Sequence, residues 1–231
     1  MKLRRHRGPR ARAVPAAVLA VLALSGCGAL TPGTAAVVNG TRISTDEVTK
    51  LADAQCAGVA LAAKMQQGQA VARKTMAQNA LSLLMDIRLN QDFASSLGLH
   101  PRPASANAIY AQVDPLIQAL PAKQRPVTER VFHRWASARD LMTQVGERVS
   151  GQSATPQNTE AVLNAAYQKR ESWLKKIKIE TDPRYAPDKV GFPGAGDGSV
   201  SRPSSEFAKG ATASKPDAKW ISGLPADQRC G

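Results

Sequence analysis

Three cysteines are the residues with the most specific potential chemistry in this chain. Cys27 follows Leu24, Ser25 and Gly26, small or apolar residues that come at the end of an apolar run. A cysteine thiolate is a nucleophile and can become covalently modified or bonded to a second sulfur. Cys56 and Cys230 lie far apart in the sequence. The sequence therefore allows one modified thiol and one disulfide.

The chain begins as a secretory signal peptide would. Met1–Arg12 contains lysine and arginine but no acidic residue, and Ala13–Leu24 is apolar apart from Pro15. A basic start, a short apolar stretch and small residues before a cleavage point are typical of such a signal. Twelve residues span only about 18 Å as a helix, whereas a membrane-spanning helix needs about 20 residues. An uncleaved anchor is the alternative, and this length disfavours it.

Leu24-Ser25-Gly26-Cys27 resembles the lipobox of bacterial lipoproteins. The resemblance implies a diacylglyceryl lipid on Cys27, cleavage before this residue, and no other cofactor. Residues 1–26 would then be the signal peptide and residues 27–35 a lipidated linker. Each buried CH₂ contributes about 0.8 kcal/mol, so two acyl chains hold a protein on a bilayer. We expect the chain on the extracytoplasmic face of the cell membrane, the alternative being an ordinary cleaved signal with a chance cysteine.

The other two cysteines can be paired or free. A disulfide is stable outside the cytoplasm. Because the loop between Cys56 and Cys230 is long, the chain-entropy model gives a stabilisation of roughly 4–5 kcal/mol as an upper figure. The alternative is two free thiols, one in a helix and one in a loose tail.

The charge of the chain favours anionic surfaces as partners. The formal net charge is +13, but six of these charges belong to lysine and arginine residues before Cys27, which leaves +7 for the rest of the chain. The modest positive charge that is left favours lipid headgroups and wall polymers. No basic stripe interleaved with aromatic residues occurs, so we do not expect nucleic acid as a partner.

Residues 36–186 begin with a hairpin and a well-marked helix start. Residues 36–43 have the pattern of a tight hairpin centred on Asn39-Gly40, the preferred pair for a type I′ turn. Ser44 and Glu47 then have the spacing of a capping box, in which each side chain bonds the other's backbone N–H. This predicts a helix that begins at Thr45.

Helical spacing of apolar residues continues through most of the chain. It predicts further helices over residues 69–97, over 106–120 with Ser105 as the cap, over 128–149, and from Thr155-Pro156 onward. Charged and apolar residues alternate over residues 176–180, which predicts a short strand. The fold class is thus mainly α, with about five helices and a small β element. Residues 187–231 are rich in Gly, Pro and Ser and predict a flexible tail, pinned back only where Phe207, Trp220 or a Cys230 bridge holds it.

Two motifs at the ends of this region resemble the SurA/PrsA-type extracytoplasmic chaperones. The first is Val37-Val38-Asn39-Gly40 with Ile43-Ser44 and Glu47-Val48, and the second joins Ile177 and Ile179 to Asp182-Pro183-Arg184-Tyr185. The resemblance covers residues 36–186. It implies that the late strand pairs with the first one and that the helices cradle unfolded polypeptide.

The chain departs from that family in one respect that concerns catalysis. The family carries parvulin prolyl isomerase domains of about 90 residues between its early helices and its last one. The corresponding stretch of this chain, residues 101–155, is shorter than such a domain, and its pattern predicts helix. Ala186 also stands where the family usually has glycine. We therefore expect no prolyl isomerase activity and no enzyme.

We find no pattern in the sequence that predicts a catalytic or metal site. His100 precedes a proline in a turn, and His133 lies on the polar side of its helix. No Cys/His spacing suits zinc, and no phosphate loop or nucleophile elbow is present. Capping and solvation account best for Asp46, Glu47 and Asp140.

Two functions remain open at this stage. The first is a lipid-anchored, chaperone-like domain that binds unfolded or exported polypeptides through apolar side chains between helices. Candidate contacts are Met76, Met85, Phe132, Trp135, Met142 and Trp173, although spacing of this kind is more often that of core residues, which is the alternative for each. The second is an accessory envelope lipoprotein that docks one membrane or cell-wall partner. In that protein we expect the groove to be filled, with the tail or Trp220 in the place of a client.

Overall fold

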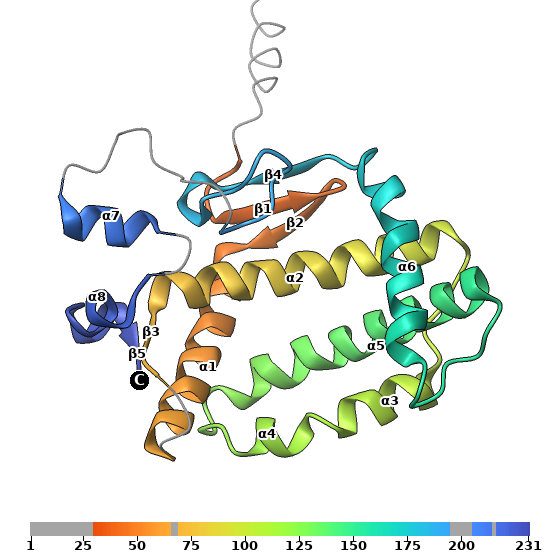
Figure 1. Ribbon diagram of the computed structural model, residues 1–231, viewed down its shortest axis with the longest axis horizontal. Helices are drawn as coiled ribbons and strands as arrows, with labels where there is room; N and C mark the ends of the chain where they lie inside the picture. Colours follow the sequence, from red (N-terminus) through yellow and green to blue (C-terminus); the bar gives the residue numbers. More distant parts are fainter. Residues whose placement is uncertain (1–29, 66–68, 195–204, 214–215) are drawn as a thin grey trace, which may run out of the picture.

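The computed structural model describes residues 30–65, 69–194, 205–213 and 216–231. The predicted lipobox and lipidation site, Leu24 to Cys27, lie outside these ranges. The described chain is mainly helical with a small antiparallel sheet, as the sequence predicts (Figure 1). Within these ranges, no helix has the length and apolar character needed to cross a membrane.

The predicted hairpin and its pairing with a late strand are confirmed. Strands β1 (Thr34–Val38), β2 (Thr41–Ser44) and β4 (Ile179–Thr181) form an antiparallel sheet in the order β2-β1-β4. Asn39 and Gly40 have φ values of 49° and 78°, the left-handed region that this tight turn requires. Val38 pairs with Ile179, which joins the two ends of the helical region. The late strand begins at Ile179 rather than at residue 176, because Lys176 and Ile177 still bond back to the end of the preceding helix.

Helix α1 (Thr45–Lys64) begins where the sequence predicts, with the Ser44 hydroxyl accepting from the Glu47 N–H at 3.1 Å. Helix α2 (Arg73–Ser96) begins later than residue 69. The reason is a pairing that the sequence does not reveal: Val71–Ala72 forms the short strand β3, which pairs with β5 (Arg229–Cys230) near the end of the chain.

The single helix predicted over residues 106–120 is wrong. The chain forms α3 (Pro103–Ala111) and α4 (Asp114–Gln118), and Ser105 lies inside α3 instead of capping it. Pro115 lacks an N–H and its ring would clash with a continuing helix, so α3 ends before it. Both Pro103 and Pro115 stand in a first helical turn, where the missing N–H has no cost.

The last two long helices differ from the prediction at their starts. Helix α5 (Arg125–Ser150) begins before residue 128 because Pro126 is tolerated in its first turn, and it ends at Gly151 with φ 69°. Helix α6 (Thr159–Leu174) begins later than Pro156, because the Asn158 carboxamide accepts from the Thr155 N–H and holds the preceding residues in a turn. Gly146 allows α5 and α6 to approach closely, since any Cβ there would overlap the backbone of Val162.

Helix α2 is the centre of the fold. The sheet covers one side of it, and α1 and α5 lie on the other side in Figure 1. Its buried residues come from every side of the helix, in agreement with its broad apolar surface. The largest fully buried side chains of the fold include Leu51, Leu81, Leu84, Met85, Ile87, Leu89, Ile117 and Met142.

Where the structure describes it, the end of the chain folds into short helices and a strand in place of a flexible tail, and the expected bridge at Cys230 pins it back. Residues 205–213 and 216–231, here named the C-terminal strap, contain α7 (Glu206–Thr212), α8 (Ala218–Ser222) and β5. Cys230 is disulfide-bonded to Cys56 of α1, with their Cα atoms 4.9 Å apart. Phe207 and Trp220 pack together with ring centres 5.5 Å apart, and Leu224 is buried. The bridge and the β3–β5 pairing offset the low apolar content on which the prediction depended.

Candidate binding groove

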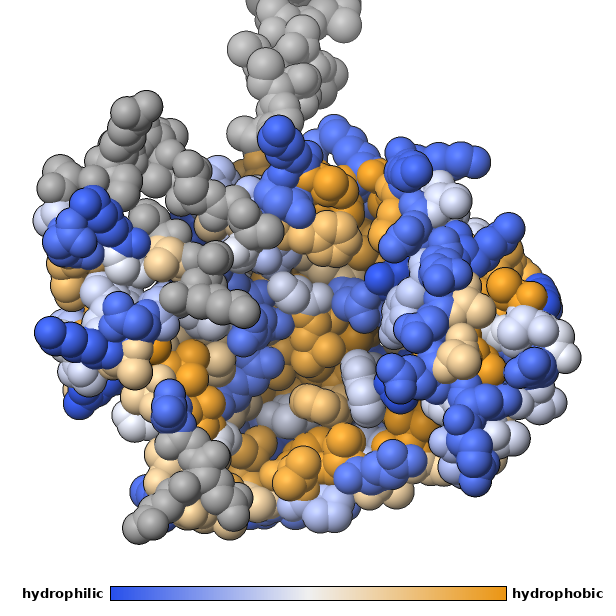
Figure 2. All heavy atoms as spheres, viewed as in Figure 1, coloured by the Kyte–Doolittle hydropathy of each residue, from blue (hydrophilic) through white to orange (hydrophobic). Residues whose placement is uncertain are grey.

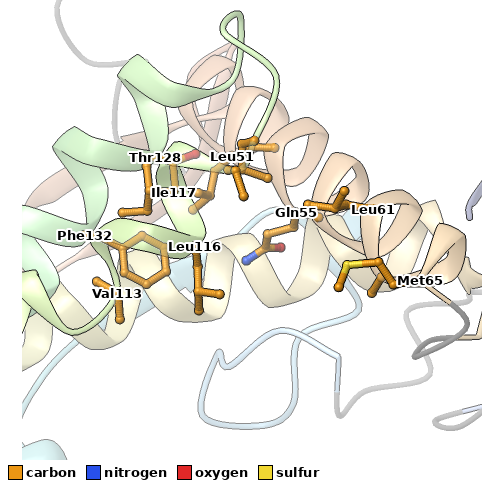
Figure 3. A pocket seen from close by; sticks show the side chains of 14 residues that line it. Leu51, Gln55, Leu61, Met65, Val113, Leu116, Ile117, Thr128 and Phe132 are labelled. Atoms are coloured by element: carbon orange, nitrogen blue, oxygen red, sulfur yellow. The ribbon is translucent and has the colours of Figure 1, made fainter.

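An apolar groove lies between the second half of α1, the α3–α4 region and the start of α5. Its volume is about 420 Å³ (Figure 3). Ligand sites in proteins range from about 300 to 1,000 Å³. The residues that line it are Leu51, Ala54, Gln55, Gly58, Leu61, Ala62, Met65, Val113, Leu116, Ile117, Ala119, Leu120, Thr128 and Phe132.

Helical spacing brings the α1 residues onto one face. Leu51, Gln55, Gly58, Ala62 and Met65 recur at intervals of three or four, so they follow one stripe along the helix. This stripe forms one wall of the groove. The absence of a side chain at Gly58 leaves room there, since an added Cβ would lie 3.8 Å from the Leu120 side chain on the opposite wall.

The groove has a buried floor and an exposed rim. Leu51 and Ile117 are buried, and they belong to the core on which the walls rest. Leu116 is 72% exposed and Met65 is 57% exposed. Among the large apolar side chains of the described chain, none is more exposed than Leu116, and only Val190 otherwise matches Met65. Figure 2 shows apolar atoms at the surface between the lower end of α1 and α4. Exposed apolar side chains that gather around a hollow typically mark a binding surface.

Two polar side chains line the groove, and they differ in how they are satisfied. The Thr128 hydroxyl donates to the Gln124 carbonyl at 2.9 Å, a bond within its own helix region. Gln55 instead has a buried Oε1 with no hydrogen-bond partner in the part of the chain that the structure describes. In Figure 3 its side chain points from α1 into the space between Leu116 and Leu61.

A buried carboxylate fixes the wall opposite α1. Asp140 of α5 is fully buried and accepts from the Arg102 N–H at 2.7 Å and from the Arg102 Nε at 2.9 Å. The Gln144 side chain donates to it as well, at 2.9 Å. These bonds hold the residue that precedes α3. The expectation that Asp140 is a solvated carboxylate is therefore wrong. Its capping role lies with a neighbouring helix, since it accepts from the N–H of Arg102, the residue before α3.

The environment of Asp140 favours its charged form. Burial alone would raise the pKa of this carboxyl, but hydrogen bonds from the Arg102 N–H and from the Ser105 and Arg102 side chains outweigh that effect. They hold the pKa of Asp140 below its ordinary value of 3.8. The α3–α4 wall therefore depends on a carboxylate that stays ionised through the physiological pH range.

The structure separates the six predicted contact residues. Met85 and Met142 are fully buried and Met76 is nearly so, which places all three in the core. Trp135 and Trp173 are partly buried and pack against core clusters, and neither lines the groove. Of the six, only Phe132 lines the groove.

The sequence missed most of the groove, although part of its signal was present. Leu51, Gln55 and Ala62 belong to the apolar stripe of the helix predicted from Thr45, and Leu116 belongs to that of the helix predicted over residues 106–120. Each stripe predicts burial, and periodicity alone does not show which part of a stripe lacks a cover. Met65 stands at the end of α1 and had no distinguishing pattern.

The histidines have ordinary surroundings. The His133 ring stacks on the Tyr110 ring with centres 3.7 Å apart, and His100 lies in an exposed loop whose carbonyl accepts from Gln144. Over the described ranges, no three His, Cys, Asp or Glu side chains come together as metal ligands would.

The chain was compared with models of protein families, with curated proteins and with solved structures, and none of these matches it. The SurA/PrsA resemblance therefore depends on the two terminal motifs alone.

Proposed function

We propose that the chain is a membrane-anchored lipoprotein of the cell envelope whose helical domain binds apolar segments of unfolded polypeptides in the groove, without prolyl isomerase activity. The observation that carries this proposal is an open apolar groove with exposed Leu116 and Met65 on its rim. A monomer gains nothing from leaving such side chains in water, and a client that covers them removes apolar area from water at about 25 cal/mol per Å².

The position of the C-terminal strap supports a groove that is free to bind. An accessory lipoprotein would be expected to fill the groove with its own tail or with Trp220. The described strap instead lies on another side of α1, where Trp220 borders a second hollow with Ala52 and Asp53. No described strap residue lines the groove.

The direction of the groove agrees with a tether at the N-terminus. The described chain enters β1 at the sheet, on the upper side of Figure 1, whereas α4 and the end of α1 form the lower side. With Cys27 lipidated, the sheet side would face the bilayer and the groove would open away from it. A client could then approach from the envelope space.

The proposal is tested by the effect of the full chain on aggregation of an unfolded client, followed by light scattering. Leu116→Glu places a charge on the groove rim and should abolish the suppression of aggregation. Val149→Glu is the matched control, since Val149 is 47% exposed on α5 and does not line the groove.

Two further outcomes of that experiment decide between the alternatives. If the unchanged chain fails to suppress aggregation of several clients, the accessory role with a single partner is favoured. Turnover in a prolyl isomerase assay run in parallel would contradict the proposal of a binding domain without isomerase activity.

A further inference from the structure

Gln55 is the polar side chain of the groove that the fold itself does not satisfy. Its Oε1 is buried and lacks a partner among the described residues, and apolar side chains form most of its surroundings. Leaving a buried acceptor unpaired is costly, and fully buried polar groups in proteins almost always have a partner. A ligand in the groove that brings a donor to this oxygen would remove that cost.

The chemistry of the missing donor separates three kinds of apolar ligand. An acyl chain has no N–H. A helix has apolar side chains, but its backbone N–H groups already bond to its own carbonyls. An extended polypeptide carries an unbonded N–H at every residue apart from proline, beside side chains that alternate in direction. Of these three ligands, the extended segment offers a backbone donor together with apolar side chains.

We propose that Gln55 selects extended apolar polypeptide segments: rotation of its terminal amide turns the unpaired Oε1 into the groove, where it accepts a hydrogen bond from a backbone N–H of the bound segment. This inference is a refinement of the proposed function and depends on it. Leu116 and Phe132 lie on the wall facing Gln55 in Figure 3 and would receive the side chains next to the bonded residue. The recognised feature is then the unfolded backbone, and the sequence of the client matters only through its apolar character.

The consequence is discrimination against ligands that are equally apolar. A helix or an acyl chain would cover the groove and leave the Gln55 oxygen unpaired and further desolvated. Sites that contain a buried polar group reject ligands that fail to pair it far more strongly than purely apolar sites do. Without Gln55, the groove would retain its apolar attraction and lose this preference.

The test uses the full chain in phosphatidylcholine vesicles, with empty vesicles subtracted, and two fluorescent peptides. One is a short peptide of alternating valine and threonine with lysines at its ends. The other has the same sequence with alternate backbone nitrogens methylated, which removes donors and keeps the apolar side chains. Binding is followed by fluorescence anisotropy. The unmethylated peptide should bind about five- to ten-fold more tightly, the ratio expected from one hydrogen bond to a buried acceptor.

Gln55→Met keeps the length of the side chain and removes the acceptor, so it should reduce this preference to near one. Gln112→Met is the control, because Gln112 is exposed at the end of α3 and does not line the groove. It should preserve the preference. Equal binding of the two peptides to the unchanged chain, or a preference that survives Gln55→Met, would overturn the role of Gln55.

The proposed function would fail in a different way. In that case neither peptide would bind, or Leu116→Glu would leave the binding of both unchanged. If both peptides bind, if Leu116→Glu abolishes their binding and if methylation has no effect, the groove is a binding site and the selection by Gln55 is rejected.

Discussion

The second half of α1 has two faces that the fold treats differently. One face carries Cys56 and Val59 and is covered by the end of the strap, where Gly231 lies against Val59 and Ala63. The adjacent face carries Gln55, Gly58 and Ala62 and borders the open groove. Both faces are apolar and belong to one helix. The comparison shows that apolar character alone does not decide whether a surface is closed by its own chain.

The covered face is held by specific bonds rather than by a large apolar contact. The disulfide closes a separation of 174 residues, and β3 and β5 are only two residues long each. The strap is otherwise joined to the body by interactions such as the bond from the Lys74 ammonium to the Ala211 carbonyl at 3.4 Å. A long loop with few contacts at its end should depend strongly on its covalent link.

Removal of that link is the change with the largest expected effect. We expect Cys56→Ser together with Cys230→Ser to lower the free energy of unfolding by about 4 kcal/mol, since the unfolded chain regains the entropy of a long loop. Urea unfolding followed by circular dichroism measures this loss. A reducing agent should destabilise the unchanged chain and leave the double variant as it was. Equal stability of the two proteins would show that the strap is held by its non-covalent contacts.

The groove wall opposite α1 should depend on Asp140. We expect Asp140→Asn to lower the free energy of unfolding by about 2–3 kcal/mol, less than the ~3–5 kcal/mol for a wholly buried pair. The figure is lower because the Arg102 side chain is 46% exposed. Glu147→Gln is the control, because Glu147 contacts the same arginine at 3.2 Å and is itself partly exposed. It should cost less than 1 kcal/mol by urea unfolding. A cost for Asp140→Asn no larger than that of the control would contradict this role.

The same carboxylate predicts a dependence of stability on acid. The pKa of Asp140 is lowered in the fold, so its contribution is complete above the ordinary value of 3.8 and is lost as the pH falls through the lower folded value. Thermal unfolding between pH 5 and pH 2 measures this slope. Asp182 has a lowered pKa too, through bonds from Arg184, and contributes in the same direction. Asp140→Asn should therefore reduce the slope without abolishing it, and an unchanged slope would contradict the prediction.

The strap should also depend on its buried leucine, to a smaller extent. Leu224 is 6% exposed between the strap and the body. We expect Leu224→Ala to cost about 2 kcal/mol, at the low end for a buried leucine, because the strap lies at the edge of the fold where neighbours can close in. Hydrogen exchange should show the loss in β3 and β5 first. A loss of protection confined to α5 and α6 would mean that the strap does not depend on this contact.

The sequence was sufficient for features with a local cause. Asn39-Gly40 predicts its turn, and Ser44 with Glu47 predicts the first residue of α1, because in each case neighbouring residues fix the backbone. The sequence signal for the break at Pro115 was weaker, because a proline inside an apolar stripe allows either a kinked helix or two separate helices. The sequence also does not show that the start of α3 is held by bonds between Arg102 and Asp140, residues that are 38 positions apart.

The strap and the groove depend on distant contacts, and the sequence could not specify them. Two residues at β3 and two at β5 are too few for a detectable pattern, and the bridge between Cys56 and Cys230 remained one of two alternatives. The groove was hidden because Leu51 and Leu116 have the spacing of core residues. Whether such a stripe is covered depends on where the strap lies. The strap in turn is attached through the disulfide and the β3–β5 pairing.

The smallest change in stability is expected for a substitution on the exposed rim of the groove, opposite the open face of α1. Leu116 is 72% exposed, so Leu116→Ser removes little apolar area that the fold had buried. We expect the free energy of unfolding to stay within about 0.5 kcal/mol of the unchanged chain, as for exposed positions in general. Binding of an apolar peptide should weaken in the same variant. Urea unfolding and fluorescence anisotropy on one preparation separate the two effects. A stability loss as large as that of Leu224→Ala would mean that Leu116 is a structural residue and that the groove is part of the core.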